Sequence, residues 1–152
     1  MPRRGPTHGF TLIEVLIVVI IMAVLAATVI PQFANSTVDA KLGALRYNLS
    51  TLRKQIETYK AHHDSRVPEV DGTTGTLQQL LSSTDTSGTI GVGASFRYGP
   101  YLINELPQNP FTSSNAVREV TTWPPSASGN GGWVYNSLTG QIAADDPDHI
   151  GL

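Results

Sequence analysis

The most informative part of this 152-residue chain is Gly9-Phe10-Thr11-Leu12-Ile13-Glu14-Val15-Leu16. It opens an apolar run that continues to Ile30 and contains one acidic residue, Glu14. A helix of about 20 residues is long enough to cross the roughly 30 Å hydrocarbon core of a bilayer. A carboxylate costs about 2.5–3.5 kcal/mol when it lies deep in such a span. We therefore expect a cation to pair with Glu14.

Cleavage of the chain between Gly9 and Phe10 creates such a cation. The new amino group of Phe10 then starts the helix one turn before Glu14. We expect the terminal amine of a neighbouring copy to reach this carboxylate inside the apolar layer. This pairing is a mechanism for building a filament from membrane proteins.

The same residues resemble the class III signal sequence of the type IV pilin and type II secretion pseudopilin superfamily. The matching positions form a basic leader, a cleavage site, an apolar span with a displaced acid, and a later proline: Arg3, Arg4, Gly9, Phe10, Thr11, Leu12, Ile13, Glu14 and Pro31. The resemblance implies that a prepilin peptidase cuts after Gly9 and methylates Phe10, and that subunit assembly needs Glu14. It covers only the N-terminal part of the chain.

Two other interpretations of the span remain, an ordinary secretory signal peptide and a plain membrane anchor. Arg3 and Arg4 suit a basic signal region, and residues 25–27 (Leu-Ala-Ala) suit a small-residue cleavage site. However, the run is longer than the usual 7–15-residue signal core, and Glu14 interrupts its front. A plain anchor explains the length but not Glu14. Basic residues before the span predict a leader in the cytoplasm and a single pass through the inner membrane, with the remainder outside.

Composition narrows the class of protein further. The formal net charge is −2, and removal of the leader with Arg3 and Arg4 makes it −4. The sequence has no basic cluster with interleaved aromatics, so we expect no nucleic-acid partner. It has no cysteine, so no disulfide closes its C-terminal region as one does in many type IV pilins. Within the resemblance, this favours a pseudopilin.

An amphipathic helix is predicted to continue beyond the span. Its apolar residues recur at spacings of three and four: Val38, Leu42, Leu45, Leu49, Leu52, Ile56 and Tyr59. Pro31 should kink or locally break the helix, because it lacks an N–H and clashes with the preceding turn. The predicted organisation is a leader (1–9), a transmembrane and filament-core helix (10–30), an amphipathic continuation (31–64) and a globular head (65–152).

Short elements follow in the predicted head. Residues 76–81 suit a short helix, 82–93 a mobile loop and 116–122 a strand. Residues 133–144 read as a β-hairpin, with Trp133 and Tyr135 on one face and a left-handed Gly140 in the loop. Residues 98–102 and 106–111 resemble the segment before the sheet in major pseudopilins. The fold expected is an α+β pilin fold, a long N-terminal helix packed on a small antiparallel β-sheet.

Candidates for chemistry are few. His62 and His63 are adjacent and should point to different faces of a solvated helix end, without the i, i+4 spacing of a helical metal pair. Asp145, Asp146 and Asp148 form an acidic cluster, for which a solvated, frayed terminus is favoured. The resemblance leaves calcium binding open there, because many major pseudopilins bind calcium in such a loop. We predict no catalytic residue, no cofactor and no metal ligand.

The function expected is that of a structural subunit of a type II secretion pseudopilus, not an enzyme. The resemblance implies a helical homo-oligomer, lifted from the inner membrane by an assembly platform and its ATPase to drive protein export. One alternative is a type IV pilus subunit for adhesion, motility or DNA uptake. Another is a secreted enzyme, whose mature chain would begin near Thr28 instead of at Phe10.

Overall fold

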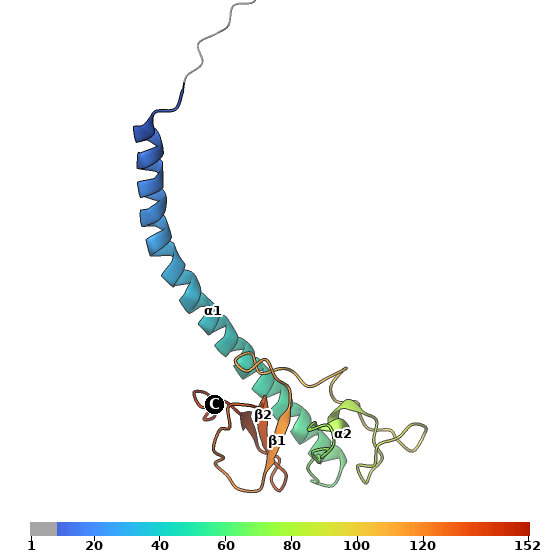
Figure 1. Cartoon of the computed structure of the whole chain (residues 1–152). Coiled ribbons are helices and arrows are strands. Elements are labelled where there is room, and N and C mark those ends of the chain that lie inside the picture. The colour runs from blue at the N-terminus through green and yellow to red at the C-terminus, as the bar shows by residue number, and fades with distance from the viewer. Residues whose placement is uncertain (1–8) are drawn as a thin grey trace, which may run out of the picture. The chain divides into compact units, whose positions relative to one another are not determined.

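The computed structural model describes the chain from Gly9 to Leu152, apart from the side chains of residues 31–35. The elements, in chain order, are α1 (Leu12–His62), α2 (Gln78–Leu81), β1 (Val117–Val120), β2 (Trp133–Asn136) and β3 (Ile142–Ala144) (Figure 1). The chain divides into two compact units, one that ends at Ala40 and one that covers Lys41–Leu152. The long helix α1 contributes to both units.

The first unit contains the start of α1. The 19 residues Leu12–Ile30 have a mean hydropathy of 3.0, and none of this segment is buried. At 1.5 Å per residue the segment is about 28 Å long, so its length and composition suit a membrane span. The helix continues through Pro31 without a break. A kink at Pro31 and the predicted domain boundaries stay predictions.

In the second unit, the predicted stripe of α1 is buried from Leu45 onward. Five of its members are at most 1% exposed: Leu45, Leu49, Leu52, Ile56 and Tyr59. Val38, which precedes this unit, is 54% exposed. The charged residues predicted on the other faces, such as Arg46 and Lys54, are exposed. The stripe is therefore the face of α1 that the head covers.

The sheet has the strand order β1-β2-β3. Strands β2 and β3 form the predicted antiparallel hairpin, in which Tyr135 is paired with Ile142, and Gly140 has the expected positive φ of 80°. The expectation of a wholly antiparallel sheet was wrong, because β1 pairs with β2 in parallel. Parallel neighbours need a crossover of about a dozen residues or more, and residues 121–132 provide it. The fold is α+β and pilin-like, with a mixed sheet.

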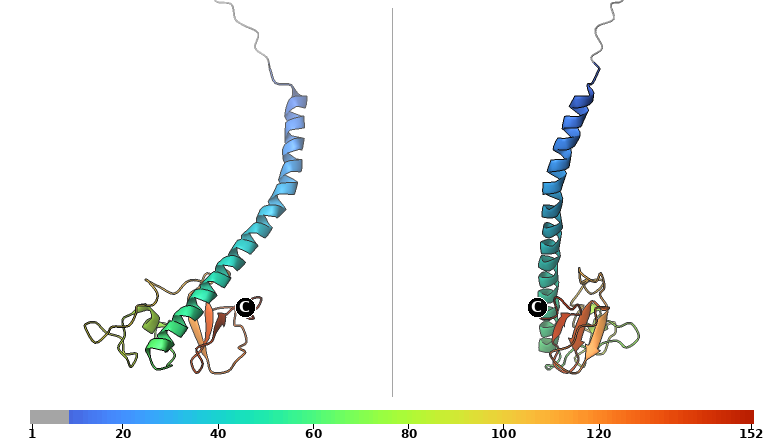
Figure 2. Two further views of the ribbon diagram at one scale, coloured as in Figure 1. Left: turned by 180° about the vertical axis from the view of Figure 1, so that it is seen from behind. Right: turned by 60° about the vertical axis from the view of Figure 1, so that its left-hand side comes forward.

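One apolar core joins the sheet to α1. Trp133, Tyr135 and Ile142 share it with the helix stripe and with Leu77 and Leu80, and Figure 2 shows the strands beside the C-terminal half of α1. Trp133 and Tyr135 therefore lie on the same face of β2, as predicted. The short helix α2 begins at Gln78, two residues later than expected.

Candidate functional site

The Gly9–Phe10 bond lies in irregular backbone just before α1. Phe10 is 83% exposed, and a side chain at Gly9 would meet no atom within 4 Å. No residue that the structure describes therefore covers this bond. Arg3 and Arg4 of the predicted leader lie outside the described residues.

Thr11 and Glu14 form a reciprocal cap at the start of α1. The Thr11 backbone N–H and hydroxyl both donate to Glu14 Oε2, at 2.8 Å each. The Glu14 N–H donates in return to Thr11 Oγ1, at 3.3 Å. This is the capping box, in which a threonine and the glutamate three residues later satisfy helix N–H groups that have no partner within the helix. The sequence signal Thr-x-x-Glu was present but was not used to predict it.

An uncovered apolar surface follows this cap. Its large side chains are between 42% and 86% exposed from Leu12 to Val29. The hydroxyl of Thr28 donates to the carbonyl of Leu25 at 2.9 Å, so this polar group is satisfied within the helix. Soluble monomers rarely expose contiguous apolar surface of this extent. The segment therefore requires lipid or other copies of the helix around it.

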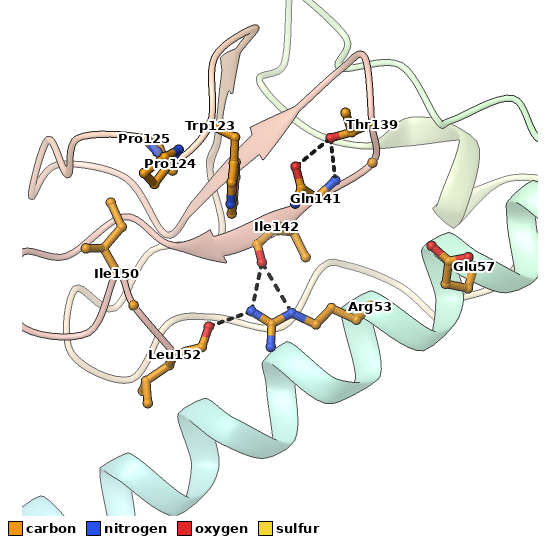
Figure 3. Close-up of a pocket in the computed structure, with 12 residues that line it drawn as sticks. Arg53, Glu57, Trp123, Pro124, Pro125, Thr139, Gln141, Ile142, Ile150 and Leu152 are labelled. Atoms are coloured by element: carbon orange, nitrogen blue, oxygen red, sulfur yellow. Dashed lines mark hydrogen bonds between the residues drawn. The ribbon is translucent and has the colours of Figure 1, made fainter.

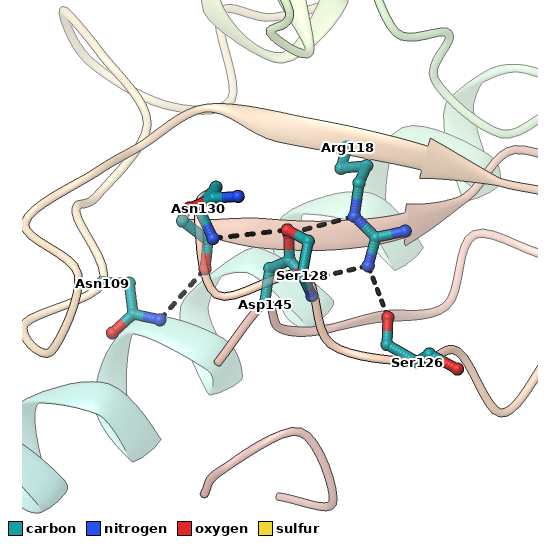
Figure 4. Close-up of polar contacts among 7 residues, drawn as sticks. Asn109, Arg118, Ser126, Ser128, Asn130 and Asp145 are labelled. Carbon is teal, nitrogen blue, oxygen red and sulfur yellow. Dashed lines mark hydrogen bonds and ion pairs between the residues drawn. The ribbon is translucent and has the colours of Figure 1, made fainter. Parts of the chain in front are cut away.

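In the head, Asp145 lies in a polar cluster that sequence reasoning missed. Its side chain is fully buried and accepts hydrogen bonds from Arg118 Nη2 at 2.7 Å and Arg118 Nε at 3.0 Å (Figure 4). The Ser128 hydroxyl and N–H also donate to it. Burial alone raises the pKa of Asp145, but the bonds from Arg118 and Ser128 hold that pKa below its ordinary value. Arg118 also donates to the carbonyl of Ser126 at 2.6 Å, which ties residues 126–128 to the sheet.

The expectation of a frayed, solvated acidic terminus was wrong for two of its three residues. Asp146 is 6% exposed and contacts His149 Nδ1 at 2.6 Å, and the His149 ring stacks on Phe111 with centroids 4.0 Å apart. Only Asp148 is exposed. Within residues 9–152, no group of three or more His, Cys, Asp or Glu side chains is placed to hold a metal ion. The partners of Asp145, Arg118 and Ser128, lie 27 and 17 residues away, so sequence spacing did not reveal them, whereas His149 follows Asp146 by only three residues.

The two histidines at the end of α1 also differ from expectation. His63 is fully buried, and both His62 and His63 contact the hydroxyl of Tyr101. They converge instead of diverging because α1 ends at His62, and the next residues turn through positive φ angles at Asp64 and Ser65.

Side chains of the core anchor the proline-containing connections of the head. Trp133 Nε1 donates to the carbonyl of Pro107 at 2.8 Å, and the Tyr135 hydroxyl donates to that of Pro68 at 2.8 Å. Buried Asn109 donates to the carbonyl of Gly132 at 3.1 Å. These bonds hold the long connections of the head on a sheet of only three short strands.

A cavity of about 610 Å³ lies where α1 meets β3 and residues 150–152. The side chain of Arg53 lines this cavity and donates to the main-chain oxygens of Ile142 at 3.1 Å and Leu152 at 2.6 Å (Figure 3). Trp123 and Pro124 line another side of it. The described hydrogen bonds of Arg53 all go to the main-chain oxygens of Ile142 and Leu152, so this residue has a structural role.

Comparison with known proteins agrees with these features. The model of the prokaryotic N-terminal methylation motif matches residues 5–30. The type II secretion system core protein G of Klebsiella michiganensis is 28% identical over 109 residues, which is 72% of this chain and 71% of the relative. That of Klebsiella pneumoniae is 31% identical over 106 residues, 70% of each chain. The fimbrial protein EcpB of Eikenella corrodens is 35% identical over 63 residues, 41% of this chain and 38% of the relative. No solved structure matches the chain.

A capped apolar helix continuous with a small α+β head, together with these relatives, defines the class of protein. The chain belongs to the type IV pilin and type II secretion pseudopilin superfamily. Within it, the chain is a structural subunit of a type II secretion pseudopilus, and among the described residues one helix segment, near the N-terminus, fits a membrane anchor. The fimbrial relative covers a smaller share of the chain, so it supports the pilus alternative less well.

Proposed function

We propose that the chain is a prepilin that a prepilin peptidase cuts between Gly9 and Phe10 and then methylates on the Phe10 amine. The exposed, irregular backbone at this bond supports the proposal, because it can enter a peptidase site without unwinding α1. The bond also precedes the apolar span Leu12–Ile30, which would leave it close to the membrane surface.

In this proposal the leader faces the cytoplasm, Leu12–Ile30 crosses the inner membrane and the head lies outside. A membrane platform and its ATPase lift subunits into a helical homo-oligomer with apolar helices inside and heads on its surface. The filament does mechanical work in protein export, and the subunit catalyses no reaction. The observation that carries the proposal is the 19-residue apolar segment Leu12–Ile30 of α1, in which no residue is buried and whose first turn contains the carboxylate of Glu14.

Within the filament, Glu14 pairs with the Phe10 amine of an adjacent subunit. The cap supports this role, because it holds the carboxylate one helical turn from the new terminus. A charge inside an apolar layer is costly alone, and a cation within reach offsets the cost. Pro31 then serves as a kink between the filament core and the head.

Mass spectrometry of the mature N-terminus tests the processing step. We expect a chain that begins at N-methylated Phe10, and we expect Gly9→Leu to accumulate as full-length precursor in the membrane. Gly5→Leu, a matched change within the leader, should mature normally. A mature chain that begins near Thr28, or normal maturation of Gly9→Leu, would contradict the proposal.

A further inference from the structure

Two histidines and a tyrosine converge where α1 ends. The Tyr101 hydroxyl lies 3.0 Å from His62 Nδ1 and 3.1 Å from His63 Nε2. These two nitrogens belong to consecutive residues, yet both point at one oxygen from a segment 38 residues further along the chain. The Thr84 hydroxyl is a further neighbour, 3.2 Å from His63 Nε2.

We propose that His62 Nδ1, His63 Nε2 and the Tyr101 oxygen bind one divalent transition-metal ion of the Zn²⁺ or Cu²⁺ type. A metal ion held at about 2.0–2.1 Å from each of two donors, at angles between about 90° and 109°, places those donors about 2.8–3.4 Å apart. The Tyr101 oxygen lies within that range of both His62 Nδ1 and His63 Nε2. Binding of the ion would displace to solvent the hydroxyl proton that Tyr101 shares with these nitrogens.

One contact of His63 suits the form of the imidazole that binds a metal through Nε2. His63 Nδ1 lies 3.4 Å from the carbonyl oxygen of Thr86. A carbonyl only accepts hydrogen bonds, so this contact suits a proton on Nδ1 and a lone pair on Nε2, on the side of Tyr101 and Thr84. Metal-binding histidines usually have such a partner on the other ring nitrogen. The Tyr59 ring, with its centroid 4.0 Å from that of His63, holds the imidazole in place.

The donor set also selects the kind of ion. Imidazole nitrogen suits Zn²⁺, Cu²⁺ and Ni²⁺, whereas Ca²⁺ and Mg²⁺ prefer oxygen ligands. His62 is exposed, so water can approach and complete the coordination. A bound ion would cross-link the end of α1 to the segment around Tyr101 and would stabilise the head.

The test uses the mature full-length chain in detergent, titrated with Cu²⁺ and with Zn²⁺. We expect one Cu²⁺ per chain, an electron paramagnetic resonance spectrum with coupling to two imidazole nitrogens, and a melting temperature that rises with Zn²⁺. His62→Ala should lose one nitrogen coupling, weaken binding at least about ten-fold and abolish the Zn²⁺ effect. Tyr101→Phe should weaken binding but keep both couplings. The exposed position of His62 makes its variant the safer test, since loss of buried His63 threatens folding.

The matched control is His149→Ala, which removes a histidine that contacts Asp146 elsewhere in the head. It should bind both ions as the wild type does. Equal affinity of the wild type and His62→Ala would overturn the proposal. So would a Cu²⁺ spectrum without imidazole coupling, or a melting temperature that does not change with Zn²⁺.

Discussion

Glu14 offers two distinct properties, an acceptor oxygen and a negative charge. The acceptor oxygen closes the cap on Thr11, and this needs no charge, because glutamine also serves at that position of a capping box. The proposed contact with a terminal amine needs the charge. The cap also satisfies part of the carboxylate before assembly, which reduces the cost of holding it at the edge of a membrane.

The ion pair between Arg118 and Asp145 makes the stability of the head depend on pH. The native pKa of Asp145 lies below its ordinary value of 3.8. Ionised Asp145 therefore stabilises the head above its ordinary pKa, and this stabilisation is lost as the pH falls through its lower native pKa. We expect Asp145→Asn to lower the free energy of unfolding by about 1.5–3 kcal/mol at pH 7, and by less at pH 3.

Urea unfolding of the mature chain in detergent, followed by tryptophan fluorescence, measures this difference, since Trp133 is buried in the head core. Asp148→Asn is the control, because Asp148 is exposed, and it should change stability little at either pH. An Asp145→Asn deficit that is the same at pH 7 and pH 3 would show that the charge of Asp145 does not stabilise the head.

Among the elements, those with local signals were predicted and those that depend on distant partners were not. The stripe of α1 and the β2–β3 hairpin follow from the spacing of apolar residues and from Gly140. The direction of β1 depends on where a long connection returns to the sheet, and no local pattern shows that. The buried environment of Asp145 likewise depends on Arg118, 27 residues away.

The helix stripe yields a prediction of its own. Leu49→Asp places an unpaired charge in the core, which costs several kcal/mol. A small domain has only about 5–15 kcal/mol of stability in total, so the head should unfold, and the fluorescence of Trp133 should shift to that of an exposed indole. Tyr47→Asp is the matched control on the same helix, because Tyr47 is 73% exposed, and it should keep a native head.

A native melting temperature for Leu49→Asp would mean that the stripe is not the face that the head covers. Unfolding of Tyr47→Asp to the same extent would show that any new charge on this helix is disruptive, and burial would not explain the result.

The whole molecule has two apolar parts, a core buried inside the head and an exposed apolar span at the start of α1. The head buries its apolar residues in a core of its own and uses side-chain bonds to backbone carbonyls, at Pro68, Pro107 and Gly132, where a cysteine-free chain has no disulfide. No residue of the span from Leu12 to Ile30 is buried. In such a subunit the apolar residues of the head are covered within one chain, whereas those of the helix are covered only by the neighbouring helices of a filament core.

The yield of assembled filaments from Glu14→Gln tests the central claim most directly. Glutamine keeps an acceptor for the Thr11 cap but removes the charge, so the mature subunit should be cut, inserted and folded at wild-type levels. Thr11→Ser, which keeps both the hydroxyl and the charge, is the control and should assemble normally. The account predicts few or no filaments from Glu14→Gln without wild-type subunits, beside normal membrane content. Abundant filaments from Glu14→Gln would show that Glu14 acts only as a helix cap, and the proposed contact with the Phe10 amine would be contradicted.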